Sequence, residues 1–174
     1  MSMQKELSTE DWLKPVSLNS MEEIIKQMKN CVCEIHKGQN KGSGFFTKIL
    51  YKNELLYLLI TNEHVLGNDY FKKSKNITLS INNNKVVKHI KIDSNRKIYI
   101  NENLDITIIE IKQKEDKIYD FLELDDNILN NENINDYNNL YEGKSIYVLN
   151  YKDDEIYSSF GLLNNIVDHK ISHR

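Results

Sequence analysis

The sequence predicts a mostly β protein, with a short N-terminal helix, a six-stranded antiparallel barrel and the opening strands of a second barrel. The first observation is composition: the apolar residues are mainly isoleucine, leucine, valine and tyrosine, and none of the 174 residues is alanine, which is typical of sheets. The second is spacing, because turn residues separate the apolar runs too closely for the crossover helices that parallel strands require. Six such strands in a meander close most naturally into a barrel, which leaves no exposed edge.

Composition and charge exclude several classes of partner. Hydrophobic residues make up 40% and charged residues 28% of the chain, as in folded proteins with a core. The net charge of −3 and the lack of a basic stripe argue against nucleic acid as a partner. The longest apolar run is too short to cross a bilayer, and residues 1–12 lack the apolar segment of a secretory signal. We therefore expect a cytoplasmic or intracellular protein without a membrane partner.

Residues 1–30 are expected to form a polar tail and a short helix. Ser20 and Glu23 have the spacing of a capping box, with Ser20 as the N-cap and Glu23 reaching back to it. The apolar residues that follow share one face of a helix at about residues 21–29. This helix precedes the change to strand-like periodicity at residue 31.

Residues 31–112 are expected to form the first barrel. Turn residues punctuate its strands, and the three asparagines at 82–84 are a hairpin signal. The fifth strand has an apolar continuation at 97–100. The predicted strands cover residues 31–36, 44–51, 55–61, 76–81, 86–93 and 104–111.

Two further regions follow the first barrel. Residues 113–143 are acidic and rich in asparagine, which indicates a linker or surface loop with little burial. Residues 144–174 regain apolar periodicity, with strands predicted at 144–150 and 155–167. Two strands cannot bury a core alone, so we expect a companion C-terminal segment to complete this second barrel.

One histidine and one aspartate are the candidate catalytic residues. The apolar run 55–60 predicts a buried strand, and His64 comes just after it, where the core can hold a general base rigidly beside a cleft. Asp105 lies between Leu104 and Ile106 at the predicted start of another buried strand. An unpaired aspartate there would be costly, so a histidine partner is expected.

Four segments stand in this order: Gly42-Ser43-Gly44-Phe45-Phe46, Ile60-Thr61-Asn62-Glu63-His64-Val65, Leu104-Asp105-Ile106-Thr107-Ile108-Ile109 and Gly143-Lys144-Ser145-Ile146-Tyr147-Val148. In this order and spacing they resemble the chymotrypsin-fold, trypsin-like serine peptidases, and in particular their intracellular, HtrA-like branch. The resemblance covers about residues 31–167 and implies that the barrels are of the trypsin-like type. It also implies that His64 is the general base and Asp105 the carboxylate that orients it.

The family pattern is incomplete in one respect. The nucleophile of these peptidases lies in a Gly-x-Ser-Gly loop, and no such motif occurs in the 174 residues. Ser43 has flanking glycines but matches a structural strand of the first barrel, and the later serines lie in strand contexts or near residue 174. The resemblance therefore implies an endopeptidase acting on polypeptides, truncated before its nucleophile loop and inactive as this chain alone. The alternative is a non-catalytic, protease-like module that binds peptides or has a structural role.

A zinc site is a rival interpretation. Cys31 and Cys33 could supply thiolates, and His169 and His173 could supply imidazoles from one face of a helix. The Cys-x-Cys spacing is poor for tetrahedral zinc, and two cysteines so close on a strand are poorly placed for a disulfide. We expect two free thiols in a reducing compartment, and neither a metal nor a cofactor.

Overall fold

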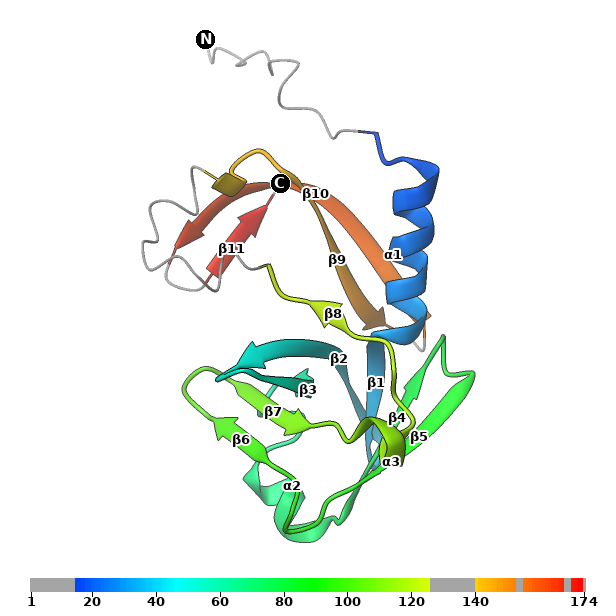
Figure 1. Ribbon diagram of the computed structural model, residues 1–174, viewed down its shortest axis with the longest axis vertical. Helices are drawn as coiled ribbons and strands as arrows, with labels where there is room; N and C mark the ends of the chain where they lie inside the picture. The colour runs from blue at the N-terminus through cyan, green and yellow to red at the C-terminus, as the bar shows by residue number, and fades with distance from the viewer. Residues whose placement is uncertain (1–14, 126–139, 153–154, 168–169, 174) are drawn as a thin grey trace.

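The computed structural model describes residues 15–125, 140–152, 155–167 and 170–173, and it is mostly β (Figure 1). Three helices lie among the strands: α1 (Leu18–Asn30), α2 (Asn68–Lys73) and α3 (Gln113–Asp116). The strands are β1 (Val32–Lys37), β2 (Asn40–Tyr51), β3 (Glu54–Thr61), β4 (Asn76–Ile81), β5 (Val86–Lys91), β6 (Ile98–Asn101), β7 (Ile106–Glu110), β8 (Leu122–Glu123), β9 (Ser145–Lys152), β10 (Glu155–Val167) and β11 (Lys170–His173).

The first sheet is a curled half-barrel. Its strand order is β5-β4-β1-β2-β3-β7-β6, all neighbours are antiparallel, and β8 adds a short parallel pairing to β2. No ladder joins β5 to β6, so the sheet differs from the predicted closed barrel of six strands. The predicted continuation of the fifth strand is a separate strand, β6, because a turn at 92–97 interrupts it.

The concave face of this sheet encloses the core. Side chains with no exposed surface come from β1, β2, β3, β4, β5 and β7, and from the segment after β3. The predicted hairpin at 82–84 is confirmed, and all three asparagines there have positive φ angles of 52° to 60°, which asparagine tolerates better than most residues. The fully buried apolar side chains are Cys33, Ile35, Phe46, Leu59, Leu66, Ile77, Leu79, Ile90 and Ile109.

Helix α1 starts earlier than the capping motif predicted. Ser17 is the N-cap, and its Oγ accepts a hydrogen bond of 3.1 Å from the Ser20 main-chain N–H. Ser20 is therefore inside the first turn, and the predicted capping box with Glu23 is wrong. The reason is that Ser17 and Ser20 are both suitable caps at a three-residue spacing, and the upstream serine adds one more helical turn.

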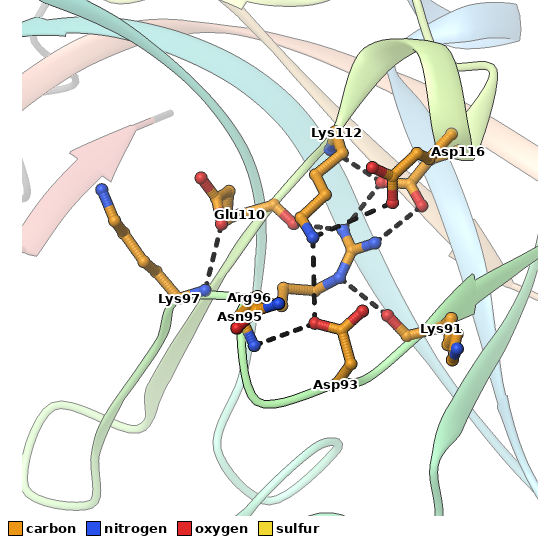
Figure 2. A network of polar contacts seen from close by, with 9 residues as sticks. Lys91, Asp93, Asn95, Arg96, Lys97, Glu110, Lys112 and Asp116 are labelled. Carbon is orange, nitrogen blue, oxygen red and sulfur yellow. Dashed lines mark hydrogen bonds and ion pairs between the residues drawn. The ribbon is translucent and has the colours of Figure 1, made fainter.

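A buried ion pair fills the gap in the ladder between β5 and the β6–β7 edge (Figure 2). The guanidinium of Arg96 donates to the carbonyl of Lys91 at the end of β5 (2.8 Å) and to the carbonyl of Glu110 at the end of β7 (2.7 Å). It also forms two hydrogen bonds, of 2.7 and 2.9 Å, with the carboxylate of Asp116 on α3. A side chain therefore replaces the ladder that would close the barrel.

Residues 113–125 are not the exposed linker that the composition predicted. Asp116 and Ile118 are buried, and Ile118 belongs to the core cluster. Helix α3 and strand β8 lie in this segment, and both pack on the half-barrel, α3 against β5 and β8 against β2 (Figure 1). The asparagine-rich residues 126–139, which suggested the linker, lie outside the described residues.

A second, smaller sheet packs against the first. Its order is β11-β10-β9, all antiparallel, so it has one strand more than the sequence predicted. Two hydrogen bonds fix it to the half-barrel: the Tyr151 main-chain N–H donates to Ser43 Oγ (3.3 Å), and that of Ile156 donates to Asn83 Oδ1 (3.2 Å). Among the described residues, no helix is long and apolar enough to span a membrane.

Candidate functional site

His64 lies in the turn that follows β3. The main-chain N–H groups of Val65 and Leu66 both donate to the Asn62 carbonyl at 3.2 Å, which makes this turn a compact loop. Thr61 before the histidine and Val65 and Leu66 after it are buried, so the loop is held to the core on both sides of the exposed His64. The Lys37 ammonium also donates to the His64 carbonyl at 3.1 Å. The predicted position, just after a core strand, is confirmed.

The close packing of this loop depends on Gly42. A Cβ atom at Gly42 would lie 2.6 Å from both methyl groups of Val65, which is too short for a contact between non-bonded carbon atoms. The loop is tied from the other side by Thr107 on β7, whose hydroxyl donates to the Leu66 carbonyl at 2.9 Å. These two contacts fix the backbone next to His64.

Asp105 lies in the turn before β7, not inside the strand that the sequence predicted. Strand β7 starts at Ile106, Leu104 is 64% exposed, and Asp105 has a φ of +50°. Aspartate is among the few residues that adopt this left-handed conformation readily. The turn directs the Asp105 side chain away from the sheet and toward the loop after β3, which a continuous strand could not do.

The two turns bring Asp105 and His64 into direct contact. One carboxylate oxygen, Oδ1, accepts the His64 main-chain N–H at 3.0 Å, and Oδ2 lies 2.8 Å from the ring Nδ1. Asn62 completes the arrangement, because its side-chain amide donates to Asp105 Oδ2 (3.1 Å) and to the Asp105 carbonyl (3.2 Å). Nothing in the sequence pattern pointed to Asn62, although it stands two residues before the histidine.

These contacts define the charge and the tautomer of the pair. The pKa of Asp105 lies below its ordinary value of 3.8, first because the His64 main-chain N–H donates to the carboxylate, and then because the ring and Asn62 also donate. An ionised carboxylate can only accept hydrogen bonds. The neutral imidazole therefore carries its proton on Nδ1, and its Nε2 has a free lone pair. Such a nitrogen can accept a proton from a nucleophile.

The pair is open to solvent. The side chains of His64 and Asp105 are 69% and 45% exposed. The prediction that Asp105 is buried is therefore wrong. The desolvation cost from which a histidine partner was expected is small. Among the described residues, nothing is hydrogen-bonded to His64 Nε2. A hollow of about 360 Å³ beside the ring is lined by side chains of both charges, among them Lys37, Glu63, Lys72 and Glu102.

A larger cavity of about 1220 Å³ lies between the two sheets and reaches Asp105 from the other side. Its walls come from α1, from the ends of β1, β2 and β3, from residues 120–123 and from β9. The dyad of His64 and Asp105 thus separates two hollows, one at the imidazole and one at the carboxylate.

Within the described part of the chain, the other chemically active side chains do not form a competing site. Ser80 Oγ lies 2.9 Å from the ring Nε2 of His36, but Ser80 is 1% exposed and its hydroxyl donates to Asn84. Cys31 and Cys33 are free and buried. Burial raises the pKa of the Cys31 thiol to about 11, and it raises that of Cys33 further, so neither is a thiolate nucleophile at neutral pH.

The zinc interpretation lacks its helix. His173 is the last residue of strand β11, and residues four apart along a strand lie about 13 Å from each other, which is too far for their side chains to bind one zinc ion. His169 lies outside the described residues. Among the residues that are described, no group of three histidine, cysteine, aspartate or glutamate side chains could hold a metal ion.

Comparisons with protein-family models, with curated proteins and with solved structures find no match to this chain. The functional proposal therefore depends on the geometry of His64 and Asp105.

Proposed function

We propose that His64 and Asp105 are the base and the orienting carboxylate of a serine-type endopeptidase. One observation supports this function best: a single carboxylate accepts from both the main-chain N–H and Nδ1 of His64 and leaves Nε2 free. General-base catalysis needs this combination of a fixed ring and an unoccupied acceptor. The proposal takes the nucleophile to be a serine outside the residues given.

The reaction would be acyl transfer. His64 Nε2 takes the proton of the serine hydroxyl while the oxygen attacks a peptide carbonyl carbon, and the negative charge of Asp105 stabilises the imidazolium that forms. The imidazolium then gives its proton to the leaving amine as the C–N bond breaks. Water repeats the sequence on the acyl-enzyme, and the carboxylic acid product leaves.

Turnover of a quenched fluorescent peptide by the protein made from its complete gene tests the proposal. His64→Ala and Asp105→Asn should each lower kcat by about 10⁴-fold, the size of effect seen when a catalytic triad loses the correct tautomer. The matched controls are His89→Ala, whose ring contacts Thr78 at 3.1 Å, and Asp93→Asn, which caps the turn before Arg96. Equal turnover in all four variants would overturn the assignment.

A non-catalytic peptide-binding module is the second candidate. It is favoured by the lack of any hydroxyl or thiol bonded to His64 Nε2 among the described residues. A fluorophosphonate probe separates the two candidates, because it reacts only with an activated serine. Labelling that His64→Ala abolishes supports the enzyme, and a folded protein that is never labelled supports the binding module.

A further inference from the structure

Strand β9 has one unpaired edge. It is the end strand of its sheet, with β10 as its only strand partner among the described residues. The register pairs Lys152 with Glu155 across the hairpin, so alternate residues of β9 direct their main-chain groups toward β10. The others, Tyr147, Leu149 and Tyr151, direct theirs away from it. Of these three N–H groups only that of Tyr151 has a partner in the described part of the chain, which is Ser43 Oγ.

This edge opens into the larger cavity. Tyr147, Val148 and Leu149 all line it, and three consecutive residues of a strand can do so only where the cavity reaches the strand's edge, because successive side chains point to opposite faces. The strand is fixed at both ends of this stretch. The Tyr147 hydroxyl donates to Gln27 on α1 at 2.5 Å, and Tyr151 is tied to Ser43 on β2.

The charged side chains in the walls of the cavity are predominantly acidic. Four carboxylates line it, those of Glu23, Asp105, Asp120 and Glu123, against one ammonium, that of Lys26. Asp105 is engaged by His64, and Glu123 by Lys48 at 2.6 Å. Glu23 and Asp120 stand on different walls, one on α1 and one on the segment before β8. A ligand with positive charges would complement them.

We propose that an extended polypeptide segment with lysine or arginine side chains binds in this cavity as an additional strand on β9. The main-chain N–H and C=O groups of Tyr147 and Leu149 would pair with the segment, and Glu23 and Asp120 would attract its cationic side chains. The segment would then lie between β9 and Asp105. Its role as a substrate rests on the proposed function, but its binding does not.

The decisive variant is Leu149→Pro. Proline removes the N–H of residue 149, which faces the cavity. The ladder to β10 stays intact, because the main-chain groups of residue 149 point away from β10. Leu149→Ala is the matched control, because it shortens the same side chain and keeps the N–H. The probe is a fluorescent peptide of about ten residues that alternates lysine and threonine, measured by fluorescence anisotropy with the 174-residue chain.

We expect the peptide to bind saturably. Leu149→Pro should weaken binding by about tenfold, because one hydrogen bond is lost and the proline ring blocks the approach of the peptide. Leu149→Ala should bind the peptide as the unmodified chain does. Replacing lysine by glutamate in the peptide should abolish binding. Glu23→Gln with Asp120→Asn should weaken binding of the lysine peptide. If Leu149→Pro does not fold, two readouts on the unmodified chain replace it: loss of binding by a fully N-methylated peptide, and slower hydrogen exchange at the Tyr147 and Leu149 amides when peptide is bound.

Three results would overturn the proposal: no binding, equal binding by Leu149→Pro and Leu149→Ala, or self-association of the chain that Leu149→Pro abolishes, which would assign the edge to a second copy. The proposed function fails separately. If the peptide binds as expected but turnover does not change in His64→Ala, the β9 site stands and the peptidase assignment fails.

Discussion

Asp105 accepts hydrogen bonds from two groups of the same residue, the main-chain N–H of His64 at 3.0 Å and its ring Nδ1 at 2.8 Å. The first contact fixes the backbone of the loop, and the second fixes the ring. A carboxylate that bonded the ring alone would lack this contact to the main chain of the loop, which Gly42 and Thr107 also hold in place. The double contact is therefore what makes His64 a positioned base on an exposed surface.

The titration of Asp105 should report these contacts separately. Its pKa is lowered chiefly by the His64 main-chain N–H and only secondarily by the ring. We expect His64→Ala to raise the Asp105 pKa only part of the way to its ordinary value, because alanine keeps the main-chain donor. The measurement is the side-chain carboxyl ¹³C shift against pH, with Asp69, whose pKa is lowered by Lys72, as the control that should not move.

The lowered pKa of Asp105 makes the stability of the fold depend on pH. A carboxyl group whose pKa is depressed on folding stabilises the fold above its unfolded value, which is near 3.8, and this contribution disappears as the pH falls through the folded pKa. Stability contributed by Asp105 should thus be complete above about pH 5 and lost in stronger acid. A full return of the Asp105 pKa to its ordinary value in His64→Ala would contradict the dominance of the main-chain contact.

Much of the fold could be predicted from periodicity. The hairpin at 82–84, the strand before His64 and the return of strands after residue 144 all have local signals, and the structure has them. The helix start was predicted wrongly because Ser17 and Ser20 are both suitable caps, and the role of the segment 113–125 could not be predicted because it depends on tertiary contacts. A charged stretch resembles a linker until Asp116 is seen to face Arg96 inside the protein.

The candidate site was predictable to the level of residues but not of geometry. The spacing of the motifs predicted His64 and Asp105 as a pair, and the structure brings the two side chains together. Two local features then set the details: the left-handed backbone of Asp105, which delays the start of strand β7 to Ile106, and the side-chain amide of Asn62, which donates to the carboxylate. Neither feature has a periodic signature, because each depends on a single residue conformation.

Gly42→Ala should destabilise the protein and loosen the His64 loop. The added Cβ would lie 2.6 Å from the methyl groups of Val65, and overpacking of this kind costs about 1–3 kcal/mol. Urea unfolding measures the loss. The control is the double variant Gly42→Ala with Val65→Ala, which removes the clashing methyl groups. If the double variant is less stable than each of the single variants, steric conflict with Val65 is not the cause.

Arg96 and Asp116 should show strong coupling in a double-mutant cycle. Their side chains are 1% and 3% exposed, and breaking a buried pair by removing one partner costs about 3–5 kcal/mol, because an uncompensated charge stays behind. Arg96→Met and Asp116→Leu should therefore each destabilise the fold, and the double variant should cost less than their sum. Some cost should remain, since the Lys91 and Glu110 carbonyls lose a donor.

The matched control for this cycle is the exposed pair of Lys48 and Glu123. Glu123→Gln should leave the free energy of unfolding nearly unchanged, because exposed ion pairs contribute little. Additive effects of Arg96→Met and Asp116→Leu in the urea-unfolding measurements would show that the two side chains do not act as a unit.

The ¹⁵N spectrum of the neutral His64 imidazole tests the central claim most directly. Because the carboxylate of Asp105 accepts from Nδ1, the proton should reside on Nδ1, and Nε2 should give the shift of an unprotonated nitrogen. Asp105→Asn should shift the equilibrium toward the tautomer protonated at Nε2, while Asp93→Asn should leave it unchanged. A wild-type spectrum with the proton on Nε2 would contradict the claim, because His64 could then not accept a proton from a nucleophile at that nitrogen.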